Sequence, residues 1–366
     1  MIDVVPGDRH RGAVTNLLLF VGGLAGLVVG AELLVRGASR LALSFGVSPL
    51  VVGLTVVAFG TGSPELAVTI GAGLDGNAGV AVGNVVGSNV LNVLLILGAA
   101  ALITPLFVDA QIVRQEVPIM IGASLLLLPL GIDGRLDLLD GTVLLGAMVA
   151  YTAFLIVQSR RQTADRAPED ASEVPRAGWD RHWTVQLLLV AVGLAALVQG
   201  ADWFVTAAVS VASAMGLSDV VIGLTIVAAG TSMPEVATSI MAAIRGERDI
   251  AIGNVVGSNV FNILGCLGAT ALIAPGGIPV APSILNFDVW IMLAAALACL
   301  PVFLTGREIA RWEGAVFVGY YVAYVAYLIL AAQNHDVLPA FSRVMMTFVV
   351  PITIVTLVAS LLRARH

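Results

Sequence analysis

Two glutamates stand inside otherwise apolar helical stretches, 170 residues apart. Glu65 lies in GLTVVAFGTGSPELAVTI (53–70) and Glu235 lies in GLTIVAAGTSMPEVATSI (223–240), and the two stretches are identical at 11 of 18 positions. A carboxylate near the centre of a bilayer is costly and usually marks an ion path. A single such glutamate could be a protonated structural residue, but a duplicated one favours a buried acidic site to which each half of the chain contributes.

A proline precedes each glutamate and predicts a broken helix. Pro64 has no backbone N–H, so we expect the helical hydrogen bonds to fail about one turn upstream, near Gly60. The carbonyl oxygens from Ala58 to Thr61 would then be free to bind a cation, since irregular backbone at membrane depth is tolerated where it lines a cavity. The same pattern recurs in the second copy at Ala228, Thr231, Pro234 and Glu235.

A second duplicated motif supplies neutral oxygen atoms. GNVVGSNVLN (83–92) and GNVVGSNVFN (253–262) match at 9 of 10 positions. Each carries a serine and an asparagine at i and i+4, which places them on one helical face; these are Ser88 with Asn92 and Ser258 with Asn262. The glycines of the motif also favour close helix packing. Carboxylate, hydroxyl, amide and carbonyl oxygens together suit hard cations such as Ca²⁺ and Na⁺.

The charge of the site narrows its chemistry. Two ionised carboxylates close together need about two positive charges, from one Ca²⁺ or from two or more Na⁺. Such ions would exclude one another, as an antiporter requires. Protonation could neutralise the pair instead, because neighbouring buried carboxylates raise each other's pKa. The sequence therefore leaves Na⁺ and H⁺ open as coupling ions.

Composition identifies the class of protein. The chain of 366 residues is 58% hydrophobic and only 11% charged, whereas a soluble domain is about 25% charged. Apolar segments long enough to cross a bilayer as helices predict an all-α integral membrane protein. We expect eleven spans, near 16–35, 47–72, 78–103, 114–131, 139–158, 185–208, 218–243, 250–273, 286–304, 313–332 and 338–362.

Counting spans predicts the architecture. Five spans in each repeat make the second repeat enter the membrane from the opposite side, so the core is two inverted five-helix repeats, ten helices in all, with an extra C-terminal helix. The predicted divisions are 1–158, the linker 159–184, 185–332 and 333–366. Of 18 arginines, 14 fall on one side, which predicts an outside N-terminus and a cytoplasmic linker and C-terminus in the cell membrane.

These motifs resemble the cation/Ca²⁺ antiporter superfamily, in particular prokaryotic Na⁺/Ca²⁺ exchangers. The resemblance is carried by GTGSPE (60–65), GTSMPE (230–235) and the two GNVVGSN blocks. It implies ion sites between spans 2, 3, 7 and 8 and alternating access, with spans 1 and 6 sliding as a gate. It implies a central Ca²⁺ site on the carboxylates of Glu65 and Glu235 and the carbonyls of Thr61 and Thr231. The implied flanking Na⁺ sites and adjacent amides are Ala58, Ala228, Ser232, Ser88, Ser258, Asn92 and Asn262.

Two departures from the family pattern bear on coupling. Gly62 stands where the second repeat has Ser232, which puts a three-Na⁺ stoichiometry in doubt. Asn262 stands where K⁺-dependent relatives carry an aspartate, so K⁺ co-transport is not expected. Glu32, Asp202 and Cys266 are left out of the site, the cysteine as a packing residue.

The sequence favours a Ca²⁺/Na⁺ antiporter, with a Ca²⁺/H⁺ antiporter on the same glutamates as the alternative and a cation channel as a weaker one. An enzyme is not expected, because no HExxH motif and no nucleophile–base pair is visible. The expected partners are Ca²⁺, Na⁺ and the lipid bilayer. No resident cofactor, nucleic acid or protein partner is predicted.

Overall fold

The computed structural model describes residues 6–75, 78–165, 182–215 and 228–364. The first half of the chain contains helices, short π-helical turns (η) and two short strands. In order these are α1 (Pro6–Phe45), α2 (Pro49–Val52), η1 (Gly53–Val57), α3 (Ala58–Thr61), α4 (Ser63–Leu74), α5 (Ala78–Leu91), η2 (Asn92–Leu97), α6 (Gly98–Ile103), β1 (Leu106–Phe107), η3 (Ile112–Glu116), α7 (Val117–Leu130), β2 (Arg135–Leu136) and α8 (Leu138–Asp165).

The second half repeats this order and then adds a last helix. Its elements are α9 (Trp183–Ala214), α11 (Ala228–Gly230), α12 (Met233–Ile244), α13 (Arg248–Val260), η7 (Phe261–Leu267), α14 (Gly268–Ile273), β3 (Ile278–Pro279), η8 (Ile284–Asp288), α15 (Val289–Leu304), β4 (Glu308–Ile309) and α16 (Arg311–Ala332). The addition is α17 (Leu338–Val344), η9 (Met345–Val349) and α18 (Val350–Ala364).

Long apolar helices confirm the prediction of an all-helical membrane protein. Within the described residues, nine helices are long and apolar enough to cross a membrane, and the bent pair Pro49–Thr61 and Ser63–Leu74 makes a tenth. The predicted span 218–243 begins outside the described residues, and its described part, α12, is a shorter apolar helix. Most of the predicted linker also lies outside them, and α8 continues past 158 to Asp165.

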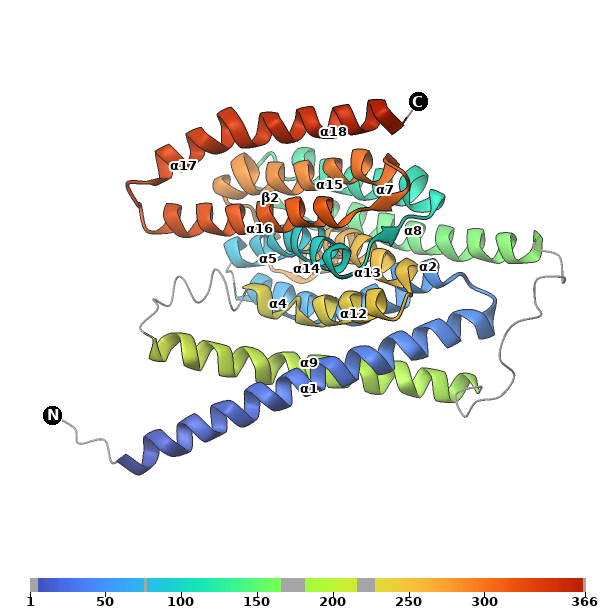
Figure 1. Ribbon diagram of the computed structural model, residues 1–366, viewed down its shortest axis with the longest axis horizontal. Coiled ribbons are helices and arrows are strands. Elements are labelled where there is room, and N and C mark those ends of the chain that lie inside the picture. Colours follow the sequence, from blue (N-terminus) through green and yellow to red (C-terminus); the bar gives the residue numbers. More distant parts are fainter. Residues whose placement is uncertain (1–5, 76–77, 166–181, 216–227, 365–366) are drawn as a thin grey trace.

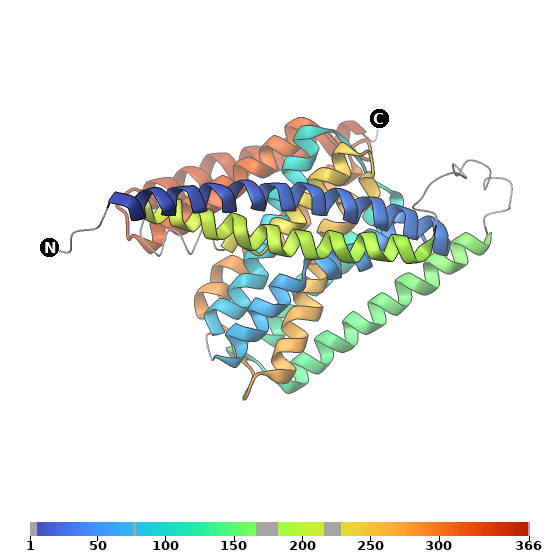
Figure 2. The same cartoon turned by 90° about the horizontal axis from the view of Figure 1, so that it is seen from below.

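Elements of the first half contact elements of the second half in antiparallel pairs. β1 pairs with β4 and β2 pairs with β3, so each strand pair joins the two halves. Helices α1 and α9 lie side by side (Figures 1 and 2), with Gly23 beside Phe204 and Gly30 beside Gly193. As the residue numbers rise along α1, those of the contacting residues in α9 fall, so the two helices run antiparallel. Inverted repeats require this orientation of their first helices. The full five-plus-five arrangement stays a prediction.

Glycines allow α1 and α9 to approach backbone to backbone. A Cβ atom added to Gly23 would lie 2.6 Å from the Phe204 nitrogen, and one added to Gly30 would lie 2.8 Å from the Gly193 oxygen. Real Cβ atoms do not come so close to backbone atoms, so a larger residue would push the helices apart. This pair forms one outer layer of the molecule (Figure 1).

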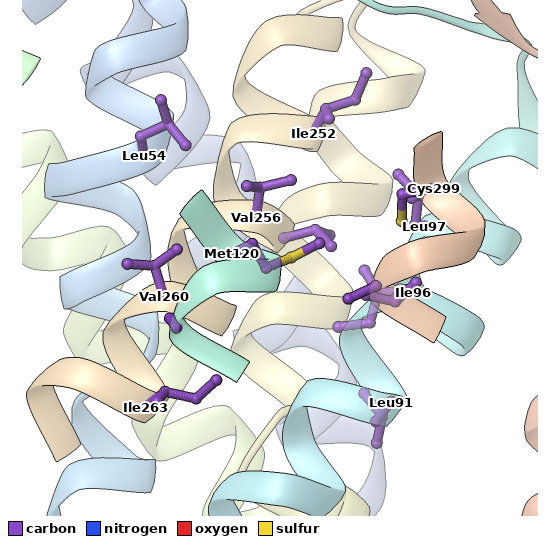
Figure 3. Packing of buried hydrophobic residues seen from close by; sticks show 14 of the residues in the cluster. Leu54, Leu91, Ile96, Leu97, Met120, Ile252, Val256, Val260, Ile263 and Cys299 are labelled. Atoms are coloured by element: carbon purple, nitrogen blue, oxygen red, sulfur yellow. The ribbon is translucent and has the colours of Figure 1, made fainter. Parts of the chain in front are cut away.

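The centre of the protein is the span formed by α13, η7 and α14. In its most apolar stretch 94% of residues are buried, against 6% for α16 and none for the last helix. Figure 3 shows apolar side chains of both halves meeting there, among them Leu54, Met120 and Val256. The last helix lies at the opposite side of the molecule from α1 and α9 (Figure 1), where its apolar surface can face lipid.

Candidate cation site

The predicted helix breaks lie directly before both glutamates. The first bends by 47° between α3 and α4, at Gly62. Beyond the bend the ladder resumes, with the Leu66 N–H donating to the Gly62 carbonyl at 3.1 Å and the Val236 N–H to the Ser232 carbonyl at 3.0 Å. Each glutamate therefore lies in the first turn of a new helix, where a helix dipole favours negative charge.

Some of the carbonyl oxygens that we expected the helix break to leave without a hydrogen bond do have one. The Ala58 carbonyl accepts the Gly62 N–H at 3.0 Å, so it is not freed. The Gly60 carbonyl, which loses its donor to Pro64, accepts the Ser63 hydroxyl at 2.8 Å instead. In the described part of the chain, the carbonyls of Thr61 and Thr231 receive no backbone N–H across the two breaks. These two threonine carbonyls are thus the ones that the two breaks leave without a backbone partner among the described residues. Ala228 is the first residue of α11.

The carboxyl groups of Glu65 and Glu235 are fully buried near one another. Each residue is 1% exposed, and the two carboxyl groups are close enough to interact electrostatically. The Ser232 hydroxyl, from the second half, donates to Glu65 Oε1 at 2.8 Å and lies 3.2 Å from the Ser88 hydroxyl. Residues of both repeats therefore meet in one acidic, membrane-buried cluster.

Several oxygen atoms in this cluster have no hydrogen-bond partner. Among the described residues, they include one buried oxygen from each of five predicted ligands: Glu65 Oε2, Glu235 Oε2, Asn92 Oδ1, Thr231 Oγ1 and Ser258 Oγ. Unpaired buried acceptors are unfavourable unless something positive compensates them. A hard cation carried as substrate fits this donor set, which contains oxygen alone.

Two asparagines that the sequence reasoning missed hold the predicted amide ligands. Asn92 Nδ2 donates to Asn259 Oδ1 at 2.9 Å, and Asn262 Nδ2 donates to Asn89 Oδ1 at 3.1 Å. Both bonds join the first half of the chain to the second. In each, the predicted ligand, Asn92 or Asn262, is held by its amide nitrogen, so its amide oxygen points away from the bond. The signal was present, because Asn89 and Asn259 end the repeated GNVVGSN motif.

Methionine sulfur atoms and threonine or serine hydroxyls contact the asparagines of the two motifs. Asn259 Nδ2 lies 3.3 Å from Met120 Sδ, and Asn89 Nδ2 lies 3.6 Å from Met292 Sδ. The first asparagine of each motif is also bound, Asn254 to Ser239 at 2.9 Å and Asn84 to Thr69 at 3.2 Å. Asn254 Oδ1 additionally accepts a bond from the Thr61 hydroxyl at 3.1 Å, which links the two halves beside the glutamates.

The residues left out of the site have other contacts. Glu32 forms an ion pair with Arg245, which joins α1 to the end of α12. Asp202 accepts a bond from Gln199 at 3.4 Å. Cys266 is closer to the site than expected from a packing residue, since its sulfur lies 3.8 Å from Asn262 Oδ1. Among the described residues, no cluster of three or more His, Cys, Asp or Glu side chains could hold a metal ion.

Comparison with known proteins identifies the family. The profile of the family described as "Sodium/calcium exchanger protein" matches residues 15–157 and 185–330. The chain belongs to this family. Both matched segments contain one broken helix and one GNVVGSN motif, and neither includes the last helix, α17 to α18.

Relatives of this exchanger family match almost over their whole length. The chain is 38% identical to the putative antiporter CaxA of Alkalimonas amylolytica, over 85% of this chain and 97% of that protein. It is 35% identical to the sodium/calcium exchanger MaX1 of Methanosarcina acetivorans, over 86% and 98%. The solved sodium-calcium exchanger NCX_Mj, soaked with Na⁺ and Sr²⁺, superposes with a TM-score of 0.73 at 31% identity, covering 86% of this chain and 98% of that one. The protein is thus a multi-pass membrane protein of a cation-exchanger family.

Proposed function

We propose that this protein is an antiporter that exchanges Ca²⁺ for Na⁺ by alternating access, with Glu65 and Glu235 binding both ions in turn. The observation that carries the proposal is the contact across the repeats, in which Ser232 donates to Glu65 while one oxygen of each glutamate stays unpartnered. Two buried negative charges require compensation, and one Ca²⁺ or two Na⁺ provides it. Competition for the same oxygen atoms couples the two fluxes.

The proposed ligand set follows the predicted residues, with the backbone ligands narrowed. The carboxylates of Glu65 and Glu235 and the carbonyls of Thr61 and Thr231 form the centre. Hydroxyl and amide oxygens from Ser88, Ser232, Ser258, Asn92 and Asn262 complete it. The names of the relatives MaX1 and NCX_Mj support Ca²⁺ and Na⁺ as the exchanged ions.

A second candidate function uses the same site with H⁺ as the coupling ion. It is favoured by Gly62, which removes a hydroxyl ligand that a Na⁺ ion could use. In that case the two carboxyl groups would carry protons in one direction and Ca²⁺ in the other. A cation channel is less well supported, because the carboxylates are 1% exposed and contact groups of both halves.

The test is ⁴⁵Ca²⁺ uptake by the full-length protein in proteoliposomes. An outward Na⁺ gradient is compared with an outward H⁺ gradient, each with and without an ionophore that collapses it. Uptake that follows the Na⁺ gradient supports the exchanger. Uptake that follows only the H⁺ gradient supports the second candidate, and uptake that needs neither gradient supports a channel.

The orientation belongs to the same proposal. We infer that the N-terminus lies outside and that the linker and C-terminus lie in the cytoplasm, from the positions of the arginines. Cysteine labelling tests this. Cys266 and Cys299 are buried, so a cysteine introduced into the linker at Ser172 should react with a membrane-impermeant reagent only after the cytoplasmic face is exposed.

A further inference from the structure

The two repeats are not equivalent around the cation site, because three pairs of corresponding residues differ in size or polarity. At the offset of 170 residues, Gly62 corresponds to Ser232, Phe59 to Ala229 and Phe261 to Leu91. The rings of Phe59 and Phe261 pack together with centroids 4.7 Å apart. Phe59 comes from the first repeat and Phe261 from the second, and both rings lie at the flank of the site where Gly62 lacks the serine hydroxyl.

The ring of Phe261 occupies the space that a side chain at position 62 would need. A Cβ atom added to Gly62 would lie 2.9 Å from Phe261 Cδ1 and 2.9 Å from the Ala58 carbonyl oxygen. On the other side of the ring, a Cβ added to Gly265 would lie 2.7 Å from Phe261 Cδ2. Gly62 corresponds to Ser232 and Gly265 to Leu95, so neither glycine that accommodates the ring is repeated in the other copy. The hydroxyl is excluded by packing as well as by sequence.

The hydrogen bonds differ between the halves in the same way. Ser232 reaches both Glu65 Oε1 and the Ser88 hydroxyl. The residues related to these by the repeat are Glu235 and Ser258. Both are buried, and Glu235 Oε2 and Ser258 Oγ have no partner among the described residues. The flank of the site at Ser232 thus has a carboxylate, Glu65, and two hydroxyls. The flank at Glu235 and Ser258 has a carboxylate and one hydroxyl.

The fixed charge of the site is two negative charges. Four acidic residues are buried in the described part of the chain: Glu65, Glu116, Glu235 and Glu313. Glu116 is bound by Tyr151, Gln111 and Gln115, and Glu313 Oε2 accepts the Ala310 N–H at the start of α16. Only two carboxylates therefore remain to compensate the transported ions. A third monovalent ion would add an unbalanced charge inside the membrane.

Building on the Na⁺/Ca²⁺ exchange proposed above, we propose that this protein binds two Na⁺ in place of each Ca²⁺, because Phe261 fills the flank where a further Na⁺ would need a hydroxyl at position 62. One Na⁺ binds at the Ser232 flank, with Glu65 and Ser88. The other binds at Glu235 with Ser258 and the free amide oxygen of Asn92. Both loaded forms of the site are neutral, so the exchange moves no net charge.

The experiment measures the Ca²⁺ gradient that a known Na⁺ gradient sustains in proteoliposomes at zero membrane potential, clamped with K⁺ and valinomycin. With two Na⁺ per Ca²⁺, a gradient of about tenfold in Na⁺ holds a gradient of about 100-fold in Ca²⁺; with three it holds about 1,000-fold. We expect the smaller value and the same value when the potential is shifted. A sustained gradient near 1,000-fold, or one that changes with potential, overturns the proposal.

A variant tests the role of the ring. The double variant Gly62→Ser with Phe261→Leu places the equivalent residues, Ser232 and Leu91, at these positions and removes the collision with the ring, whereas Gly62→Ser alone would clash with it. We expect the double variant to hold a larger Ca²⁺ gradient that depends on potential. Phe261→Leu alone is the matched control and should keep the wild-type ratio. A folded double variant with the wild-type ratio contradicts the assignment to Phe261.

The same experiment separates this inference from the proposed function. If a Na⁺ gradient drives no Ca²⁺ uptake while an H⁺ gradient does, the Na⁺ exchange and the two-Na⁺ coupling both fail. If Na⁺ drives uptake that responds to membrane potential, the exchange stands and the two-Na⁺ coupling alone fails.

Discussion

Asn92 Nδ2 donates to Asn259 Oδ1 at 2.9 Å, a bond that joins the first half of the chain to the second inside the membrane. Its counterpart joins Asn262 to Asn89 at 3.1 Å. In the first pair the donor's own oxygen, Asn92 Oδ1, is buried and unpartnered. An amide fixed at its nitrogen in this way presents its oxygen in one direction, as a preorganised ligand for a cation requires.

Removing this support should weaken Ca²⁺ binding. In Asn259→Ala, Asn92 loses its acceptor and its oxygen is no longer fixed, so we expect KM for Ca²⁺ to rise about tenfold, the effect of about 1.4 kcal/mol. The measurement is the Ca²⁺ dependence of initial ⁴⁵Ca²⁺ uptake. Maximal rate should change less than KM, because the carboxylates are untouched.

Met120→Leu serves as the comparison for Asn259→Ala. It keeps a side chain of similar volume against Asn259 but removes the sulfur that lies 3.3 Å from its amide nitrogen. We expect a smaller rise in KM, of about twofold, since the Asn92 to Asn259 bond remains. Equal effects of the two substitutions would mean that packing, not the amide bond, positions Asn92.

Both site glutamates should be indispensable for transport. Glu65→Gln or Glu235→Gln removes one of two charges that balance Ca²⁺, and we expect uptake to fall by about 100-fold or more. Because a glutamine has nearly the same shape, the protein should still fold and elute as a single species in gel filtration. Substantial Ca²⁺ flux through either variant would remove that glutamate from the proposed site.

Glu116→Gln is the matched control for these substitutions. Glu116 is also a buried glutamate in a membrane span, but its oxygens accept bonds from Tyr151 at 2.6 Å and from two glutamine side chains. The amide oxygen of a glutamine can keep both bonds from Gln111 and Gln115, while its nitrogen donates to the Tyr151 hydroxyl, which can also accept. We therefore expect transport close to wild type, which would separate the site carboxylates from buried carboxylates in general.

The repeated motifs made the central part of this site predictable. Glu65, Glu235 and the bend before Glu65 follow from an acid and a proline in an apolar stretch, because burial of charge and loss of an N–H have strong physical consequences. Their meeting follows from the duplication, because equivalent residues of inverted repeats lie near a common axis. The contact of Ser232 with Glu65 has this origin.

Other features depend on contacts between distant segments and could not be derived from local pattern. The sequence gives no reason why the Ala58 carbonyl should keep its bond to Gly62, or why the Phe261 ring should lie between Gly62 and Gly265. The role of Asn259 was also missed. Its partners Asn92 and Met120 lie 167 and 139 residues away, and no periodicity reveals such pairs.

The Ser232 hydroxyl should matter more for Na⁺ than for Ca²⁺. Ser232→Ala removes the group that bridges Glu65 and Ser88, and with it a neutral ligand of the proposed Na⁺ position. Ca²⁺ retains both carboxylates. We expect the Na⁺ concentration for half-maximal exchange to rise about fivefold to tenfold, with a change in KM for Ca²⁺ of about twofold or less.

Ser63→Ala is the control for Ser232→Ala. The Ser63 hydroxyl is exposed and donates to the Gly60 carbonyl at 2.8 Å, outside the acidic cluster. Its loss should leave the Na⁺ dependence unchanged. A larger effect on Ca²⁺ than on Na⁺ in Ser232→Ala would instead assign the serine to the Ca²⁺ position.

The close packing of α1 on α9 should be intolerant of added volume. In Gly30→Val, the new side chain would begin 2.8 Å from backbone atoms of Gly193 and Leu197, so the helices must separate or the residue must strain. We expect a loss of about 1–3 kcal/mol in stability, seen as a lower melting temperature in detergent. Gly146→Val, at a helical glycine where an added Cβ would meet nothing within 4 Å, is the matched control and should melt near the wild-type temperature. A normal melting temperature for Gly30→Val would show that α1 and α9 can separate without cost, and their close contact would then not contribute to stability.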